Sequence, residues 1–427
     1  MRSRLFKLGV AFRNPSFMKH YTFLLESQHW DSDRIDRYRF ENVKQLLLFA
    51  NEHSTFWKSY FKENNFFPES LDSLDQLSSL PAINKEDLIV NNINCHTTDG
   101  FGKYFLSKSS GTSGVSLSFR KNESWDSFNR ASKARGLSWY GIDPHELHGY
   151  LWGYNMGFFA SLRVGLFDAF VGRFRLFSYS EKSQRKFLRK LRHASYLHGY
   201  SSMIYELAKY LNSKDKQLLN LKGIFGTSEK ILDHYQGQIN SAFGIKAVNE
   251  YGAAETGLIG FECPEGTIHV NMEGVIVQEE NGEIIVTNIQ SLSFPIIRYK
   301  LGDYVELEGY RPCACGLNTH TIKSINGRVG KKIYGKSNAY PSLVLYYIFK
   351  NYSVKNGVNL NYKAFQNITG ELVIKVEQVL NNQERKALTK EALNYFQNDI
   401  NLVVLDDQNL HEFKGKFVDF VSRVDQH

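Results

Sequence analysis

A loop rich in glycine and hydroxyl groups precedes a β-rich run near residue 110. The stretch Ser107–Phe119 reads SKSSGTSGVSLSF, and its glycines lose more backbone freedom on folding than any other residue would. Backbone N–H groups in such a loop can surround an anion, and the Ser and Thr hydroxyls add donors. A solvated hairpin turn is the other interpretation. A P-loop NTPase is disfavoured, because Val115 follows Gly114 where that motif requires a lysine.

Two acidic residues and one arginine stand in turns that follow apolar runs. Glu255 lies in NEYGAAETG, four residues beyond Tyr251; a carboxylate there could hold Mg²⁺ against a phosphate, and the tyrosine could stack on a flat base. Asp303 ends the run PIIRYKLGD, where a carboxylate can accept both hydroxyls of a ribose. Arg328 in NGR could contact a phosphate or ribose. The alternatives are a solvated acidic turn with a core tyrosine, a strand-end turn and a solvated charge.

The cysteines raise the question of a metal. Cys263, His269, Cys313 and Cys315 offer three thiolates and one imidazole, a ligand set that suits structural zinc. The C-x-C spacing is tighter than the usual one, and free cysteines are often small buried apolar side chains, so both interpretations stand. Cys95 is expected in the core. The remaining histidines are expected to be packed or on the surface rather than catalytic, among them His145, His148, His193 and His198.

Chain length and composition limit the class of protein that can carry these candidate site residues. A chain of 427 residues with 42% apolar and 22% charged residues indicates a globular protein of two or three domains. The net charge of +8 is spread without a basic stripe, which disfavours nucleic acid and favours an anionic small-molecule substrate. No stretch reaches the ~18 apolar residues of a membrane span. Four cysteines do not form a disulfide scaffold, so we expect a cytoplasmic protein, with a homodimer left open.

The pattern along the chain predicts an α/β protein. Residues 1–90 have helical spacing, with Asn84 as a helix N-cap. From about 100 to 310, short β-rich runs alternate with helical ones, which indicates a layered α/β domain, and the chain becomes β-rich from 282. The stretch NGRVGKKIYGKSN near 327 has the composition of a hinge. We therefore predict a large N-terminal domain over 1–327 and a small α+β domain over 328–427.

The order of these motifs resembles the adenylate-forming superfamily of acyl-CoA synthetases and adenylation domains. A Ser/Thr/Gly loop is followed by Y-G-x-x-E, R-Y-x-x-G-D and G-R at a hinge. The sequence is most similar to the phenylacetate–CoA ligase branch and its CapK-type members, which are often tied to capsular polysaccharide synthesis. The likeness covers nearly the whole chain, through the segments LPAINKEDLIVN, HGYSSMIYELAKYL, FPIIRYKLGD and CACGLNTHTIKSINGRVG. Some ligases of this branch carry a metal at such a cysteine set.

The resemblance implies ATP and Mg²⁺, a carboxylic acid, and an amine or thiol acceptor such as CoA. Glu255 would bind Mg²⁺, Asp303 the ribose, and Arg328 the ribose or phosphate. Lys416, with Lys414 as its rival, would engage the carboxylate and the phosphate. The phosphates would lie against Ser109, Ser110, Gly111, Thr112, Ser113 and Gly114, and the rest of the nucleotide along Gly226, Ser228, Glu229, Tyr251 and Gly252.

The chain also departs from the family pattern. Val115 and Ser116 stand where the phosphate loop usually has a basic residue, and Arg120 is the first one present. Gly330 and Lys331 replace an acidic pair at the hinge. The implied reaction is activation of an acid as an acyl-adenylate and transfer to an amine or thiol, in cell-surface polysaccharide synthesis. An aryl- or acyl-CoA ligase and a catalytically weak nucleotide-binding protein are the alternatives.

Overall fold

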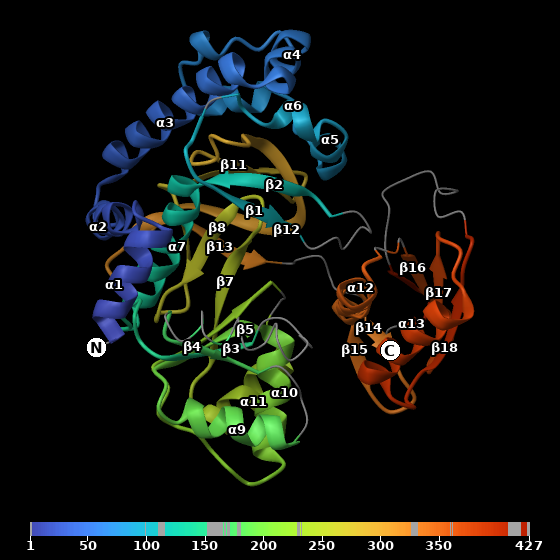
Figure 1. Cartoon of the computed structure of the whole chain (residues 1–427). Coiled ribbons are helices and arrows are strands. Elements are labelled where there is room, and N and C mark those ends of the chain that lie inside the picture. The colour runs from blue at the N-terminus through green and yellow to red at the C-terminus, as the bar shows by residue number, and fades with distance from the viewer. Residues whose placement is uncertain are drawn as a thin grey trace. The chain divides into compact units, whose positions relative to one another are not determined.

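A computed structural model describes most of the chain (Figure 1). The described residues are 2–98, 100–109, 116–151, 165, 168, 171–176, 181–228, 231, 233–325, 332–358, 360, 362–408 and 420–424. They divide into two compact units, one made of Met1–Ser107 with Ser118–Arg328 and one made of Lys108–Leu117 with Val329–His427. None of the helices in the described ranges combines the length and apolar character needed to cross a bilayer.

The first unit begins with helices, as the spacing predicts. Side chains cap the N-termini of three of these helices: Asp31 accepts from the Arg34 N–H, and Ser54 accepts from the Trp57 N–H. Asn84 forms the expected N-cap within a full capping box. The α-helices are α1 (Arg2–Arg13), α2 (Phe17–Ser27), α3 (Ser32–His53), α4 (Thr55–Glu63), α5 (Lys85–Val90) and α6 (Asn92–Cys95), with short 3₁₀ turns at Pro68–Ser70 and Asp75–Ser79.

An eleven-stranded sheet forms the centre of the first unit, in the order β10-β11-β12-β13-β9-β8-β7-β6-β5-β3-β4. The strands from β4 to β7 in this order run parallel, and those from β7 to β10 antiparallel. Their bounds are β3 (His148–Leu151), β4 (Arg173–Arg175), β5 (Tyr196–Tyr200), β6 (Gly223–Thr227), β7 (Ala247–Ala253), β8 (Gly257–Glu262), β9 (Ile268–Val270), β10 (Val275–Glu280), β11 (Glu283–Asn288), β12 (Ile296–Pro312) and β13 (Asn318–Ile325).

Helices connect the parallel strands, and the inner strands β5, β6 and β7 have buried residues on both faces. Every residue of β6 is buried. The helices α9 (Glu181–Leu191), α10 (Ser201–Asn212) and α11 (Asp233–Phe243) lie together beside these strands (Figure 1). Helix α7 (Glu123–Ser138) packs on α2 through a cluster that includes Phe17, Leu24 and Phe128. The predicted α/β class is confirmed.

Two further strand pairings involve residues that precede the large sheet in the chain. The strands β1 (Tyr104–Lys108) and β2 (Ser118–Asn122) form a separate two-stranded sheet. Ile83, in the LPAI segment, forms a parallel bridge to Tyr299 of β12. The Ile83 N–H donates to the carbonyl of Arg298 at 3.0 Å, and the Lys300 N–H donates to the carbonyl of Ile83 at 2.8 Å.

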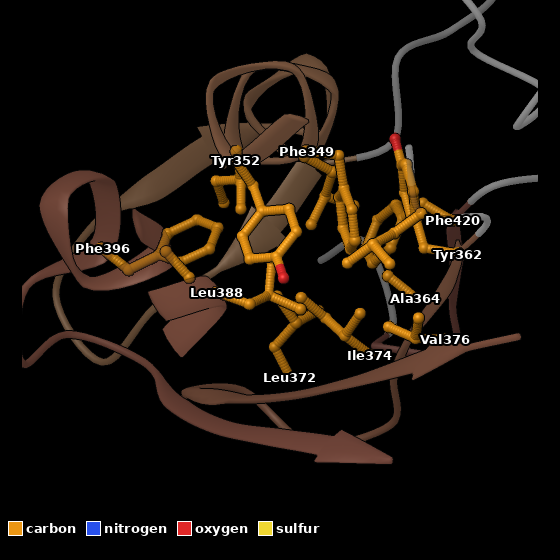
Figure 2. Close-up of a cluster of buried hydrophobic side chains, with 14 of the residues drawn as sticks. Phe349, Tyr352, Tyr362, Ala364, Leu372, Ile374, Val376, Leu388, Phe396 and Phe420 are labelled. Atoms are coloured by element: carbon orange, nitrogen blue, oxygen red, sulfur yellow. The ribbon is translucent and has the colours of Figure 1, made fainter. Parts of the chain in front are cut away.

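The second unit has its own sheet and core. Its four strands lie in the order β18-β17-β16-β19, with β16 (Tyr362–Gln366), β17 (Glu371–Val376), β18 (Asn401–Leu405) and β19 (Phe420–Ser422). Helices α12 (Leu343–Asn356) and α13 (Asn382–Phe396) cover it, and β14 (Lys332–Tyr334) pairs with β15 (Ala339–Pro341). Figure 2 shows the apolar core, in which the rings of Phe349 and Tyr362 stack with centroids 3.7 Å apart.

Candidate active site

Tyr251 and Asp303 meet, although 52 positions separate them in the chain. The Tyr251 hydroxyl donates to Oδ2 of Asp303 at 3.1 Å. Tyr251 lies near the end of β7, and Asp303 lies within β12. Two residues that the sequence analysis assigned to the same nucleotide are therefore neighbours in the first unit.

The position of Asp303 differs from the strand-end turn that was one expectation. Strand β12 continues past it to Pro312. Between the pairs Glu283↔Tyr304 and Ile285↔Lys300, two steps along β11 face four steps along β12. Such a β-bulge bends the strand and re-aims a side chain, and bulges are enriched beside active sites. Asp303 lies in this bulge, directly after Gly302, which explains how a residue inside a strand reaches Tyr251.

Glu255 lies in the tight turn between β7 and β8, where the sequence predicted a turn. Its side chain is only 5% exposed, so the solvated acidic turn that the sequence left open is wrong. Two asparagines fix the turn: Asn129 of α7 accepts from the Leu258 N–H at 2.8 Å, and Asn288 of β11 donates to the Thr256 carbonyl at 2.8 Å. Within the described ranges, no hydrogen bond or ion pair is recorded for the Glu255 carboxylate.

Glu250, one position before Tyr251, is the centre of a buried polar cluster that sequence reasoning missed. Its carboxylate is 2.5 Å from Lys133 Nζ and 2.9 Å from His198 Nε2, and the Thr227 hydroxyl donates to it at 3.4 Å. Burial alone would raise the pKa of Glu250, but the Lys133 ammonium and the His198 imidazole hold that pKa far below its usual value. The cluster joins α7 to β5, β6 and β7, so it fixes the base of the β7–β8 hairpin.

The structure describes only some of the other residues that the sequence analysis assigned to a nucleotide site. Gly252 lies in β7, where a Cβ would come within 2.2 Å of the Gly257 carbonyl, so only glycine fits. Gly226 is buried in β6, and Ser228 follows that strand with a φ of +66°. Ser109, in the second unit, is paired through its N–H and its hydroxyl with the backbone of Leu117. The residues that lie outside the described ranges are Ser110, Gly111, Thr112, Ser113, Gly114, Glu229, Arg328, Lys414 and Lys416.

The four predicted zinc ligands do come together. One ligand atom from each of Cys263, His269, Cys313 and Cys315 lies within 4.8 Å of all the others. Cys263 Sγ is 3.8 Å from Cys313 Sγ, and Cys315 Sγ is 3.3 Å from His269 Nε2. A tetrahedron with bonds of about 2.3 Å has ligands about 3.8 Å apart, so the arrangement matches a tetrahedral zinc site.

The surroundings of this Cys/His cluster also match a metal site. His269 Nδ1 is bonded to the Thr319 hydroxyl at 2.8 Å, which fixes the ring with Nε2 facing the cysteines. Burial lowers the pKa of His269 to about 4, so the imidazole is neutral near pH 7. The segments CPEGT and CACGL form the same turn, because Cys263 and Cys313 each accept from the glycine three residues later. The pairing of β9 with β13 brings the two turns together.

The chain is similar to known proteins in sequence and in fold. No protein-family model matches the chain. The chain is 24% identical over 351 residues to the protein CapK of Staphylococcus aureus. The match covers 75% of this chain and 73% of CapK.

The solved structures with a similar fold include 2-hydroxyisobutyryl-CoA ligase. In complex with 2-HIB-AMP and CoA in the thioesterification state, it matches with a TM-score of 0.64 and 16% identity, over 93% of this chain and 91% of that chain. Its open conformation matches with a TM-score of 0.57 and 16% identity, over 90% and 91%. The chain therefore has the fold of 2-hydroxyisobutyryl-CoA ligase, and its sequence is similar to that of CapK.

Proposed function

We propose that the protein is an ATP-dependent, AMP-forming carboxylate ligase. The observation that carries this proposal is the hydrogen bond between two motif residues, Tyr251 on the β7–β8 hairpin that also holds Glu255, and Asp303 on β12. In this function Tyr251 lies beside the adenine and Asp303 accepts the ribose hydroxyls. Glu255 is the residue that would hold Mg²⁺, which offsets the charge of the triphosphate.

The proposed reaction has two steps. An oxygen of the substrate carboxylate bonds to the α-phosphorus of ATP, and the bond to pyrophosphate breaks, so that an acyl-adenylate and pyrophosphate form. An amine or thiol then attacks the acyl carbon, loses its proton and releases AMP. Holding two anions together is the main barrier, which positioning and cationic groups reduce. Lys416 is proposed to engage the carboxylate and the α-phosphate, with Lys414 as its rival. The proposed nucleotide contacts also include Arg328, Glu229 and the loop from Ser109 to Gly114.

Carboxylate-dependent exchange of pyrophosphate into ATP tests the first step. A panel of aryl, fatty, amino and sugar acids identifies the acid class, and Lys416→Ala and Glu255→Ala are compared with the wild type. Exchange with one class of acid, lost in both variants, supports the proposal. Binding of ATP without exchange on any acid indicates instead a nucleotide-binding protein without ligase activity.

The acceptor is proposed to be an amine in cell-surface polysaccharide synthesis, which the similarity to CapK favours. The match to a ligase crystallised with CoA makes a thiol the second candidate. AMP release is measured with the activating acid present and with CoA, amino sugars or amino acids added in turn. Stimulation by CoA alone would replace the amine proposal with an acyl-CoA ligase.

We also propose that the Cys/His cluster binds structural zinc. Its support is the tetrahedral spacing of the four ligand atoms. Metal content after purification without affinity metals should be about one zinc per chain. Cys313→Ser should lower it, whereas Cys95→Ser, a buried cysteine outside the cluster, should leave it unchanged. A metal content near zero in the wild type would contradict the proposal.

A further inference from the structure

Lys121 is a buried cation on β2, the strand that follows the loop of Ser and Gly residues. It is 7% exposed, whereas its neighbour Arg120 points to the other face of the strand and is exposed. The ammonium lies over the ring of Trp125, 5.1 Å from its centroid, and 5.6 Å from that of Phe119. Within the described part of the chain, the Lys121 ammonium forms no hydrogen bond or ion pair.

Of the two acidic groups that act electrostatically on Lys121, one has no partner within the described ranges. The carboxylates that act on it are Asp126 and Glu255, opposed by the cations Lys133 and Arg130. Asp126 is already engaged by Arg130 at 2.8 Å and by Asn14 and Arg13. Glu255 is the residue proposed above to hold Mg²⁺. Burial lowers the pKa of Lys121 to about 8, because the charges of Asp126 and Glu255 offset only part of the cost of desolvating the ammonium.

We propose that Lys121 binds a phosphate oxygen of the nucleotide and supplies the positive charge that the Ser/Gly loop lacks. The inference rests on the proposed function, because it requires a nucleotide beside Glu255. Glu255 acts electrostatically on Lys121 without pairing with it, and a phosphate with its cation can satisfy both a buried ammonium and a buried carboxylate. Burial distinguishes Lys121 from Arg120, which the sequence alone offered as the first basic residue after the loop.

The test compares binding of Mg²⁺-ATP and of adenosine, which lacks phosphate, by isothermal titration calorimetry. Lys121→Met should weaken ATP binding by about 10- to 100-fold, the range for one hydrogen bond between charged groups. Adenosine binding should not change, and Lys121→Arg should keep most of the ATP affinity. Arg120→Met is the matched control, because it removes the same charge from the exposed face of the same strand.

The outcomes separate the inference from the proposed function. If the wild type binds no ATP, both fail. If the wild type binds ATP and Lys121→Met binds it within twofold as tightly, or loses adenosine equally, only the inference is overturned. Thermal unfolding supplies the second readout: removal of an uncompensated ammonium should not lower the midpoint. Should Lys121→Met fail to fold, Lys121→Gln replaces it, and failure of both would show a structural role and overturn the inference.

Discussion

Glu250 and Glu255 belong to the same β-hairpin and are equally buried, but their surroundings are opposite. The Glu250 carboxylate has Lys133, His198 and Thr227 within hydrogen-bond or ion-pair distance. In the ranges that the structure describes, Glu255 has no such partner, and the nearby Lys121 has none either. Burying a charge without pairing is unfavourable, so the first site is complete within the chain, and we propose that a ligand completes the second.

The difference gives a way to distinguish structural from functional charges. A carboxylate whose partners all come from the chain contributes to the fold, and its loss leaves other buried charges unpaired. A carboxylate buried without partners costs stability and is retained where it binds something. Glu250 belongs to the first kind and Glu255 to the second, and each of the following predictions tests one side of this contrast.

The largest effect is expected at Glu250. Glu250→Ala removes the buried partner of the Lys133 ammonium, which is itself partly exposed, so the free energy of unfolding should fall by about 3 kcal/mol, at the lower end of the range for breaking a buried pair. Denaturant unfolding of the purified variant measures this. Glu255→Ala serves as the control and should not lower the free energy of unfolding, because within the described ranges this buried carboxylate has no hydrogen bond or ion pair to lose. A loss at Glu255 as large as that at Glu250 would remove the contrast.

Glu255 should instead dominate the chemistry. Glu255→Gln keeps the size of the side chain and removes the charge that would hold Mg²⁺, so pyrophosphate exchange should fall by about 10²–10³-fold, as when an oxyanion-hole donor is removed. Initial rates with the best acid of the panel measure this, together with the dependence on Mg²⁺ concentration. An unchanged rate would show that the buried carboxylate is not part of the reaction.

Metal removal should give an intermediate effect on stability. If the Cys/His cluster binds zinc, removal of zinc with a chelator should lower the free energy of unfolding. The expected loss is about 2.7 kcal/mol when the reference sample contains zinc at a hundredfold excess over its dissociation constant. Thermal scans before and after readdition of zinc measure the shift. Cys313→Ser should show no response to either treatment, and a response equal to that of the wild type would place the metal elsewhere.

Tyr251→Phe should give the smallest effect. It removes the hydroxyl that donates to Asp303 and keeps the ring, so a loss of about 1 kcal/mol is expected. If that hydrogen bond serves nucleotide binding, the loss should appear as weaker ATP binding, measured by calorimetry. A loss confined to unfolding free energy would assign Tyr251 to the fold, on the side of Glu250.

The sequence predicted the elements well where the pattern was local. The helices of residues 1–90, the Asn84 cap, the turn at Glu255 and the β-rich run from 282 follow from spacing and turn residues. The Glu250 cluster could not be predicted in this way, because Lys133, His198 and Thr227 come from elements brought together only by the parallel sheet. The bulge at Asp303 depends on how β11 pairs with β12, which no local pattern reveals.

The two similar turns at Cys263 and Cys313 affect the strand register on which the direction of the Asp303 side chain depends. They close the hairpins β8–β9 and β12–β13, whose strands run back to the β7–β8 turn and to the bulge at Asp303. Because side chains alternate along a strand, a slip of one residue would turn Asp303 to the opposite face. With zinc bound as proposed, four ligands shared between the two hairpins would fix their register, and with it the direction in which a carboxylate at the other end of β12 points.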